Sequence, residues 1–197
     1  MATEADLVLN RIIQQAAADG DIYQALAAFY DCIHLSLPVD RMSMVQLEFA
    51  QKNIRIIAQA AATGSEKTNF FYAVPAYLFE LATSDDLPEI YTINDPDKDP
   101  FGKNIMERGG GTDWSLMAMP IKGPAGRYGM ILFVADGRDR FTDAHARRLL
   151  DLYPQHQWLL DTMMQDQANK RTGPDPYEPV EDEYEFFRQV TRRLCGH

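Results

Sequence analysis

Three aspartates alternate with other residues in a short acidic segment, at Asp95, Asp97 and Asp99. Carboxylates at alternate positions are the oxygen ligands that calcium-binding loops offer to the metal. The glycine and the closing glutamate of an EF-hand loop are absent from this segment. The pattern therefore favours a solvated acidic turn, with a cation site as the alternative.

Few other residues have types and spacings suited to catalysis or metal binding. The histidines His34, His145 and His156 lie singly on expected helices, which favours core-edge or solvated positions over haem or iron ligation. Cys32 and Cys195 give no metal-ligand spacing and no disulfide framework, and a reducing cytosol is the simplest fit. No nucleophile stands beside a base, and no two carboxylates have clearly distinct surroundings. We therefore expect a protein that is not an enzyme, with no catalytic residue and no metal.

One polar side chain is a candidate for a group directed into a binding site. Asp113 comes directly before Trp114 and Ser115, at the start of an apolar run. The alternative is an ordinary loop aspartate near the beginning of a strand. The glycines 109–111 lack the strand, loop and helix setting of a phosphate-binding loop, so we expect them only to loosen the backbone.

Composition and charge narrow the class of protein. The 197 residues suffice for one well-buried domain with about fifty residues to spare. With 29 acidic and 19 basic side chains, the formal charge is −10, which would repel a phosphate backbone, so we expect no direct contact with nucleic acid. No apolar run has transmembrane length and no signal peptide precedes the chain, which predicts a cytoplasmic protein without membrane contact.

The element that must position any site is a β-hairpin. The apolar runs 114–121 and 128–135 flank the turn sequence KGPAGR, which is short enough only for a tight reversal. Alternation places two sets of side chains each on one face of its strand: Ser115, Met117 and Met119, and Tyr128, Met130 and Leu132. Both faces are largely apolar, so the hairpin should be central in a sheet that is covered on both sides. Pro120 fits near a strand end or at a bulge.

Hydrophobic periodicity and turn residues predict the other elements. We expect helices over 6–18 and 22–37, strands over 41–49 and 53–62, a polar loop over 63–67, a helix over 74–81, a strand over 89–93, irregular chain over 94–100, a helical turn over 102–108 and a long helix from Thr142 that Pro154 kinks or splits. The Pro-rich acidic stretch 170–182 is a linker by composition, and a last helix covers 183–194. The predicted division is a domain over 1–169, this linker, and a helix over 183–197 that could begin a second module.

The region between the second predicted strand and the hairpin carries a group of aromatic side chains. They are Phe70, Phe71, Tyr72, Phe79 and Phe101. Long irregular segments inside compact domains are either functional or disordered, and disordered segments are poor in aromatic residues. We therefore expect a functional segment.

Beside this order of elements, the chain has scattered sequence anchors over residues 7–168: DIYQAL from Asp21, LPVDR from Leu37, SLMAMPIKG from Ser115, the run 129–134, and Phe141-Thr142. Together they resemble a GAF domain, most closely the amino-terminal GAF modules of bacterial sigma-54-dependent transcriptional activators. The resemblance implies an α+β fold related to PAS domains, with an antiparallel sheet, helices on one face and an irregular crossover or lid on the other.

The resemblance also implies a site and a role. GAF domains hold small ligands between the sheet and the crossover segment, and they commonly form homodimers through terminal helices. The implied ligand-binding residues here are Phe71, Tyr72, Phe79 and Phe101 from the lid, with Ser115, Met117, Met119, Tyr128, Met130 and Leu132 at the floor. Asp113 is the candidate polar group directed into this site. The sequence does not say which sheet face forms that floor, and plain core packing is the alternative for its methionines and aromatic residues.

Known GAF chemistries fit poorly. The cyclic-nucleotide signature starts at Asn94, Lys98 and Phe101, but its Asp and Glu do not follow. Bilin-attaching members need a cysteine in the pocket segment, and methionine-sulfoxide-reducing members need several, so the cofactor stays unknown. The expected function is small-molecule sensing in a transcriptional regulator. A ligand-free dimerisation scaffold, and an enzyme built on the GAF scaffold, are the alternatives.

Overall fold

The computed structural model describes residues 22–84, 86–108, 111–123 and 126–152, and residues 22, 66–72, 123, 126, 127 and 152 are described by their backbone alone. Several predictions concern residues outside these ranges: the helix over 6–18, the kink or split at Pro154, the linker over 170–182 and the helix over 183–194. These predictions, and the division into domains, remain predictions.

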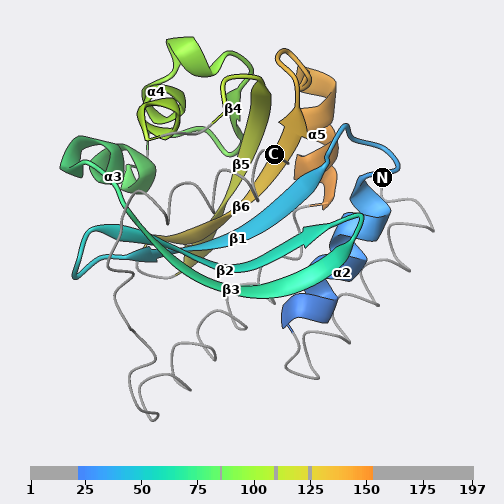
Figure 1. Ribbon diagram of the computed structural model, residues 1–197, viewed down its shortest axis with the longest axis horizontal. Coiled ribbons are helices and arrows are strands. Elements are labelled where there is room, and N and C mark those ends of the chain that lie inside the picture. The colour runs from blue at the N-terminus through green and yellow to red at the C-terminus, as the bar shows by residue number, and fades with distance from the viewer. Residues whose placement is uncertain (1–21, 85, 109–110, 124–125, 153–197) are drawn as a thin grey trace.

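A six-stranded antiparallel sheet forms the centre of the protein (Figure 1), in the order β3-β2-β1-β6-β5-β4. Its strands are β1 (Arg41–Glu48), β2 (Asn53–Ala61), β3 (Gly64–Ala73), β4 (Tyr91–Ile93), β5 (Trp114–Gly123) and β6 (Gly126–Asp136). The predicted hairpin is confirmed as β5 and β6, and β6 is one of the two central strands. Pro120 lies directly before a register shift at Ile121/Lys122, which is the kind of position that its missing N–H requires.

Helices cover both faces of the sheet. They are α2 (Ile22–Ile33), α3 (Ala76–Thr83), α4 (Pro100–Glu107) and α5 (Asp143–Leu152), together with the 3₁₀ turn η1 (Pro96–Lys98). Helices α2 and α5 pack on one face, through residues such as Leu26 and Leu149, and α3 and α4 pack on the other, through Phe79 and Phe101. The predicted α+β fold class is confirmed. None of the helices in these ranges is long and apolar enough to cross a bilayer.

The main hydrophobic core lies between the sheet and the pair α2 and α5. The apolar stripe of α2 inserts Leu26, Phe29 and Ile33 against the central strands, and the ring of Phe29 meets that of Phe133 edge-on at 6.0 Å. Burying a side chain of this size stabilises the fold by roughly 1.5–3 kcal/mol. The helix was expected to reach Leu37 but ends at Ile33, and a turn leads to Leu37, whose α conformation Pro38 disfavours.

Two predictions for the crossover region were wrong. The polar stretch 63–67, expected to be a loop, belongs mostly to β3, because the edge of β2 supplies hydrogen-bond partners that offset its low strand propensity. The stretch from Pro96 to Glu107 is more regular than expected. Asp95 accepts a hydrogen bond from Asp97 N and starts η1, and Asp99 caps the two-turn helix α4 with Pro100 at its first position.

The predicted start of the helix after the hairpin is confirmed. Thr142 Oγ1 accepts a hydrogen bond from His145 N at 3.4 Å, and His145 Nδ1 in turn accepts one from Thr142 N at 3.3 Å. This reciprocal cap satisfies two of the N–H groups at the start of α5 and fixes where the helix begins.

Candidate functional site

The sheet register divides the predicted floor between two faces. Met117 pairs with Phe133, and Met119 pairs with Ile131, all of them in the core beneath α2 and α5. Ser115 pairs with Ala135 on the same face. The single floor predicted from these residues together with Met130 and Leu132 is therefore wrong, because neighbouring antiparallel strands share a face only through paired residues.

Tyr128 leaves the predicted alternation for a local reason. Ile121 pairs with Gly129 and Lys122 with Arg127, so Tyr128 is an extra residue on β6 at the register shift. Such a bulge breaks the period of two. The Tyr128 side chain packs with the α2/α5 core, and its hydroxyl contacts Gln46 Nε2 at 3.3 Å. It thus joins the side of Met117 and not that of Met130.

The other face of the central strands, beneath α3 and α4, is the candidate site (Figure 1). Met130 and Leu132 lie on it and are half-buried, whereas Ile131 and Phe133, their neighbours on β6, are 0% exposed on the opposite face. Met130 contacts both apolar clusters of this face, one around Leu116 and Val134 and one around Leu47 and Phe79. The centre of the sheet is therefore closed on one side and incompletely covered on the other.

Two aromatic side chains of the predicted lid come together over this face. Phe79 of α3 is 5% exposed, and Phe101 of α4 contacts both apolar clusters. The ring of Phe101 also meets that of Tyr91 edge-on at 5.8 Å. Two residues of the predicted lid thus pack in the same clusters as Met130, and their role in ligand binding stays a prediction. Of Phe71 and Tyr72 only the backbone pairing in β3, with Arg55 and Ile54, is described.

Helix α4 is held in place by its own N-terminal segment. Asp99 Oδ1 accepts hydrogen bonds from Phe101 N at 2.8 Å and from Gly102 N at 3.1 Å. Its second oxygen accepts a hydrogen bond from the Tyr91 hydroxyl, and burial together with this contact raises the pKa of Tyr91. A Cβ on Gly102 would approach Pro96 O to 2.4 Å, so η1 and α4 touch backbone to backbone. The lid is therefore anchored at its start.

The aspartates of the acidic segment form ion pairs with basic side chains of the same chain. Asp95 forms ion pairs with Lys98 at 2.8 Å and with Arg138 at 3.0 Å, and Asp97 pairs with Arg138 at 2.6 Å. The contact with Lys98, more than that with Arg138, lowers the pKa of Asp95. Within the described ranges no group of three or more His, Cys, Asp or Glu side chains could hold a metal ion. The aspartates thus connect the lid segment with the loop after β6.

The residues Asp113 and Ser115 form hydrogen bonds with the same loop after β6. Asp113 is exposed, and its backbone oxygen accepts a hydrogen bond from Gly137 N at 3.0 Å. Ser115 is fully buried; its hydroxyl donates to Gly137 O at 2.7 Å and accepts from Arg140 N at 3.2 Å. The hydrogen-bonding capacity of Ser115 is therefore directed at the loop and not at the α3/α4 face.

Sequence reasoning missed a polar row on the α3/α4 face. Arg41 Nη2 pairs with Asp136 Oδ1 at 2.7 Å, and the buried Ser43 accepts a hydrogen bond from Gln59 Nε2 at 3.2 Å. Arg41 and Ser43 alternate with Met42 along β1, so polar residues at every second position of an apolar strand were the available signal. Their partners could not be known before the strand order.

A second polar cluster occupies the opposite face, at the other end of the central strands. The fully buried Arg55 forms an ion pair with Glu48 at 3.0 Å and donates a hydrogen bond to Gln46, which also contacts Tyr128. This network neutralises a buried charge within the sheet. It places Tyr128 in a structural role.

Comparisons with known proteins show that this chain is similar to solved structures in its fold. No family model matches the sequence, and no curated protein matches it either. The phycoerythrobilin-bound GAF domain of a cyanobacterial phytochrome superposes with a TM-score of 0.58 at 11% identity, covering 84% of this chain and 100% of that one. The GAF domain of a phosphoenolpyruvate-protein phosphotransferase from Coxiella burnetii gives 0.54 at 15% identity, covering 84% of this chain and 99% of that one.

A longer bacterial protein has the same fold within it. The chromophore-binding domain of the bacteriophytochrome RpBphP3 from R. palustris gives a TM-score of 0.58 at 16% identity. The alignment covers 85% of this chain and 60% of that one, so the chain spans about three fifths of that domain. Strand order, helix placement and these superpositions agree, and the chain therefore has the fold of GAF domains.

Proposed function

We propose that this chain is a non-catalytic sensory module, which binds a small molecule on the α3/α4 face of the sheet and passes a signal through its terminal helices. The proposal extends to its setting: a cytoplasmic transcriptional regulator of the sigma-54-dependent kind, acting as a homodimer and without touching nucleic acid itself. The resemblance of the sequence to such regulators supports this setting, and the formal charge of −10 supports the lack of contact with nucleic acid.

One observation carries the binding proposal. Met130 and Leu132 lie in the middle of a central strand and remain half-buried, although residues on the opposite face of that strand are fully buried. Burying apolar side chains stabilises a fold by about 25 cal/mol per Å² of surface. A sheet that serves only as a scaffold would therefore be more stable with these two side chains fully buried. Largely apolar surfaces with a few polar groups are typical of small-molecule sites.

Ligand-contacting residues in this proposal come from one face only. They are Met130 and Leu132 from β6, Phe79 from α3 and Phe101 from α4, with Tyr72 retained from the sequence prediction. Ser115, Met117, Met119 and Tyr128 support the sheet from the α2/α5 side. A thiol-linked bilin is not favoured, because Cys32, the free cysteine of the described residues, packs on α2 with the α2/α5 core.

A chain of hydrogen bonds supports transmission from the lid to α5. Asn94 lies between β4 and η1 and exchanges two hydrogen bonds with the backbone of Phe141, two residues before α5 begins. Its own backbone oxygen accepts from Asp139 N at 3.1 Å. Arg138 adds its ion pairs to Asp95 and Asp97 and donates two hydrogen bonds to Thr112 O. A ligand that moves η1 and α4 would therefore displace the start of α5.

Thermal unfolding with a panel of metabolites tests the proposal. A ligand at a hundred times its Kd stabilises the folded state by about 2.7 kcal/mol, which is measurable as a rise in Tm. Leu132→Trp, at the half-buried centre of the face, should occupy the place of the ligand and abolish the rise. Ala144→Trp, an exposed substitution on α5, should leave it unchanged.

Two results would contradict the proposal. One is a panel in which no compound raises the Tm, together with no small molecule detected by mass spectrometry of the purified protein. The other is a ligand whose effect survives Leu132→Trp undiminished, because that ligand would bind elsewhere.

A further inference from the structure

We propose that the α3/α4 face takes a small uncharged ligand, whose carbonyl or amide oxygen accepts a hydrogen bond from Arg41 Nε and whose apolar body lies over Leu132 and Met130. This inference rests on the proposed function, since it names the ligand class for the same face. The inference follows from three features: the position of Arg41, the lack of a hydrogen-bond partner for its Nε among the described residues, and the charges around its guanidinium.

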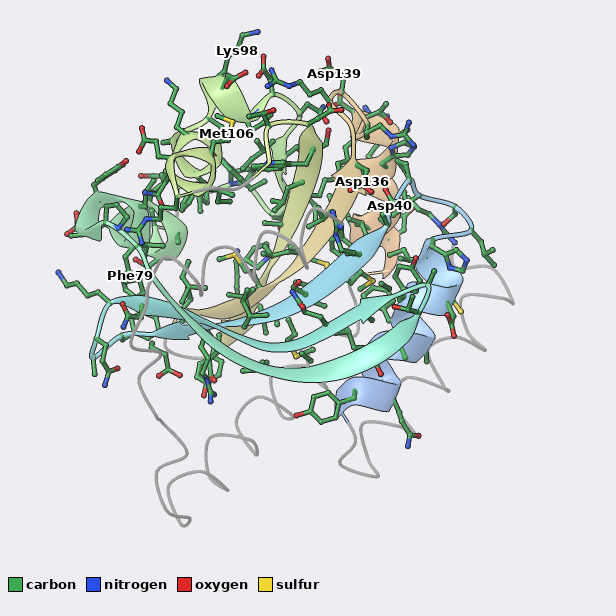
Figure 2. All side chains as sticks on the ribbon, viewed as in Figure 1. Asp40, Phe79, Lys98, Met106, Asp136 and Asp139 are labelled. Carbon is green, nitrogen blue, oxygen red and sulfur yellow. The ribbon has the colours of Figure 1, made fainter. Side chains whose placement is uncertain are left out.

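Arg41 lies on the α3/α4 face at the start of β1. It pairs with Val134, which belongs to an apolar cluster of that face, and its guanidinium reaches Asp136, two residues further along β6. Figure 2 shows Asp136 beside the first residues of β1, next to Asp40. Arg41 is therefore at one end of the half-buried row that continues with Leu132 and Met130.

The guanidinium of Arg41 has a donor to spare. Nη2 is paired with Asp136 at 2.7 Å, but Nε is buried and has no hydrogen-bond partner among the residues that the structure describes. Buried N–H groups are nearly always paired, because leaving one unpaired is costly. An acceptor from a ligand would supply the missing partner.

Local charge decides which acceptor fits. The positive charge of Arg41, whose side chain is 12% exposed, is already balanced by the carboxylate of Asp136. A second carboxylate, Asp40, is close by, because its Oδ2 accepts a hydrogen bond from Asp136 N at 2.8 Å. One cation among two carboxylates repels an anionic ligand, yet the N–H of Nε still donates. A neutral oxygen acceptor is therefore favoured over a carboxylate or a phosphate.

The surface beyond Arg41 suits an apolar body. Ser43, the next residue of β1 on this face, is already engaged with Gln59, and it pairs with Leu132. Val45 follows and pairs with Met130. Residues two apart in a strand are separated by about 7 Å, so an acceptor at Arg41 followed by roughly 10 Å of hydrocarbon or ring matches this face.

A matched set of probes tests the inference on the full chain. Hexanamide, hexanoate and hexylamine share a chain length and differ in head group, and binding can be followed by ligand-observed NMR titration. Hexanamide should bind, and the two charged probes should bind at least about tenfold more weakly: hexanoate is repelled by the two carboxylates, and the ammonium of hexylamine has no acceptor for the N–H of Nε.

Three variants separate head-group recognition from apolar contact. Arg41→Met should weaken hexanamide about tenfold, because its donor is lost, and should shift the preference toward hexylamine, because Asp40 and Asp136 are then unbalanced. Asp136→Asn should shift the preference toward hexanoate, because the charge of Arg41 is then no longer balanced. Arg140→Met, at an exposed arginine after β6, should leave all three affinities unchanged.

The inference is overturned if hexanamide does not bind, or if Arg41→Met leaves the affinity for hexanamide unchanged. The proposed function survives such a result when a metabolite of another class still raises the Tm in a way that Leu132→Trp abolishes. It fails separately when no compound binds this face at all.

Discussion

The amide side chain of Asn94 forms hydrogen bonds with both backbone polar groups of Phe141. Asn94 Nδ2 donates to Phe141 O at 2.7 Å, and Asn94 Oδ1 accepts from Phe141 N at 3.0 Å. Phe141 is 3% exposed and packs in the core beneath α5. The crossover segment and the start of α5 are thereby joined through one amide side chain, across 47 positions of sequence.

Removing this amide should destabilise the protein. Asn94→Ala leaves a buried N–H and a buried C=O of Phe141 without their partner, and we expect a loss of about 1–3 kcal/mol in the free energy of unfolding. Urea denaturation measures it. Thr92→Ala, at an exposed position on β4, is the matched control and should change stability by no more than about 0.5 kcal/mol. Equal effects of the two substitutions would rule out the role assigned to Asn94.

Gly102→Ala should be destabilising although it lies in a helix. In an open helix the change from glycine to alanine stabilises by about 0.8–1 kcal/mol. Here the new Cβ would meet Pro96 O at 2.4 Å, and overpacking of this kind typically costs about 1–3 kcal/mol. The sign of the change in urea midpoint decides between the two effects. Lys103→Ala, exposed on the same helix, should be nearly neutral, and a stabilising Gly102→Ala would show that η1 and α4 are not in contact.

The hydroxyl of Tyr91 should make stability depend on pH in the alkaline range. Burial and the hydrogen bond to Asp99 raise the pKa of Tyr91, whereas an unfolded tyrosine titrates near about 10. Above about pH 10 the unfolded chain releases a proton that the folded protein keeps. The contribution of Tyr91 to the free energy of unfolding is therefore complete below this pH and is lost as the pH rises.

The difference between wild type and Tyr91→Phe isolates this group, because the other titrating groups are common to both proteins. The urea midpoint of the wild type should fall more steeply above pH 10 than that of the variant. Parallel curves would mean that the hydroxyl of Tyr91 titrates normally.

Asp95 should produce the opposite dependence in acid. Its ion pairs, first with Lys98 and then with Arg138, lower its pKa, so its contribution is present above the unfolded value of about 3.9 and is lost as the pH falls through the folded value. Asp95→Asn should flatten the fall in thermal stability between about pH 5 and pH 3. Lys98→Met should flatten it partly, since it removes the largest cause of the shift, and an unchanged slope in both variants would contradict the assignment.

The elements that could be predicted have local signals. The turn sequence KGPAGR and the alternation around it predicted the strands β5 and β6 to within two residues at each end. The strand β3 begins with Gly-Ser-Glu-Lys-Thr, which has no such signal, because it depends on the pairing edge of β2. The cap of α4 has a local signal in Asp99-Pro100, but the two prolines of this segment, Pro96 and Pro100, also favour irregular chain.

The site was harder to predict because its residues meet only through the register. Alternation within each hairpin strand held from Met130 onward, yet it could not show that Met117 pairs with Phe133 and not with Leu132. The bulge at Tyr128 was invisible in the sequence. Arg41 and Asp136 are 95 positions apart, and nothing local marks them as partners. Strand order decides which face is incompletely covered, and strand order depends on residues far apart in the sequence.

The short strand β4 also has a consequence for solubility in crowded solutions. It pairs with only three residues of β5, from Leu116 to Ala118, and two positions further along β5 stands Pro120, which has no N–H to offer. Long flat borders of a sheet recruit strands from other molecules, whereas brief borders and prolines discourage such growth. The margin of the sheet at β4 and β5 is therefore a poor template for amyloid-like stacking.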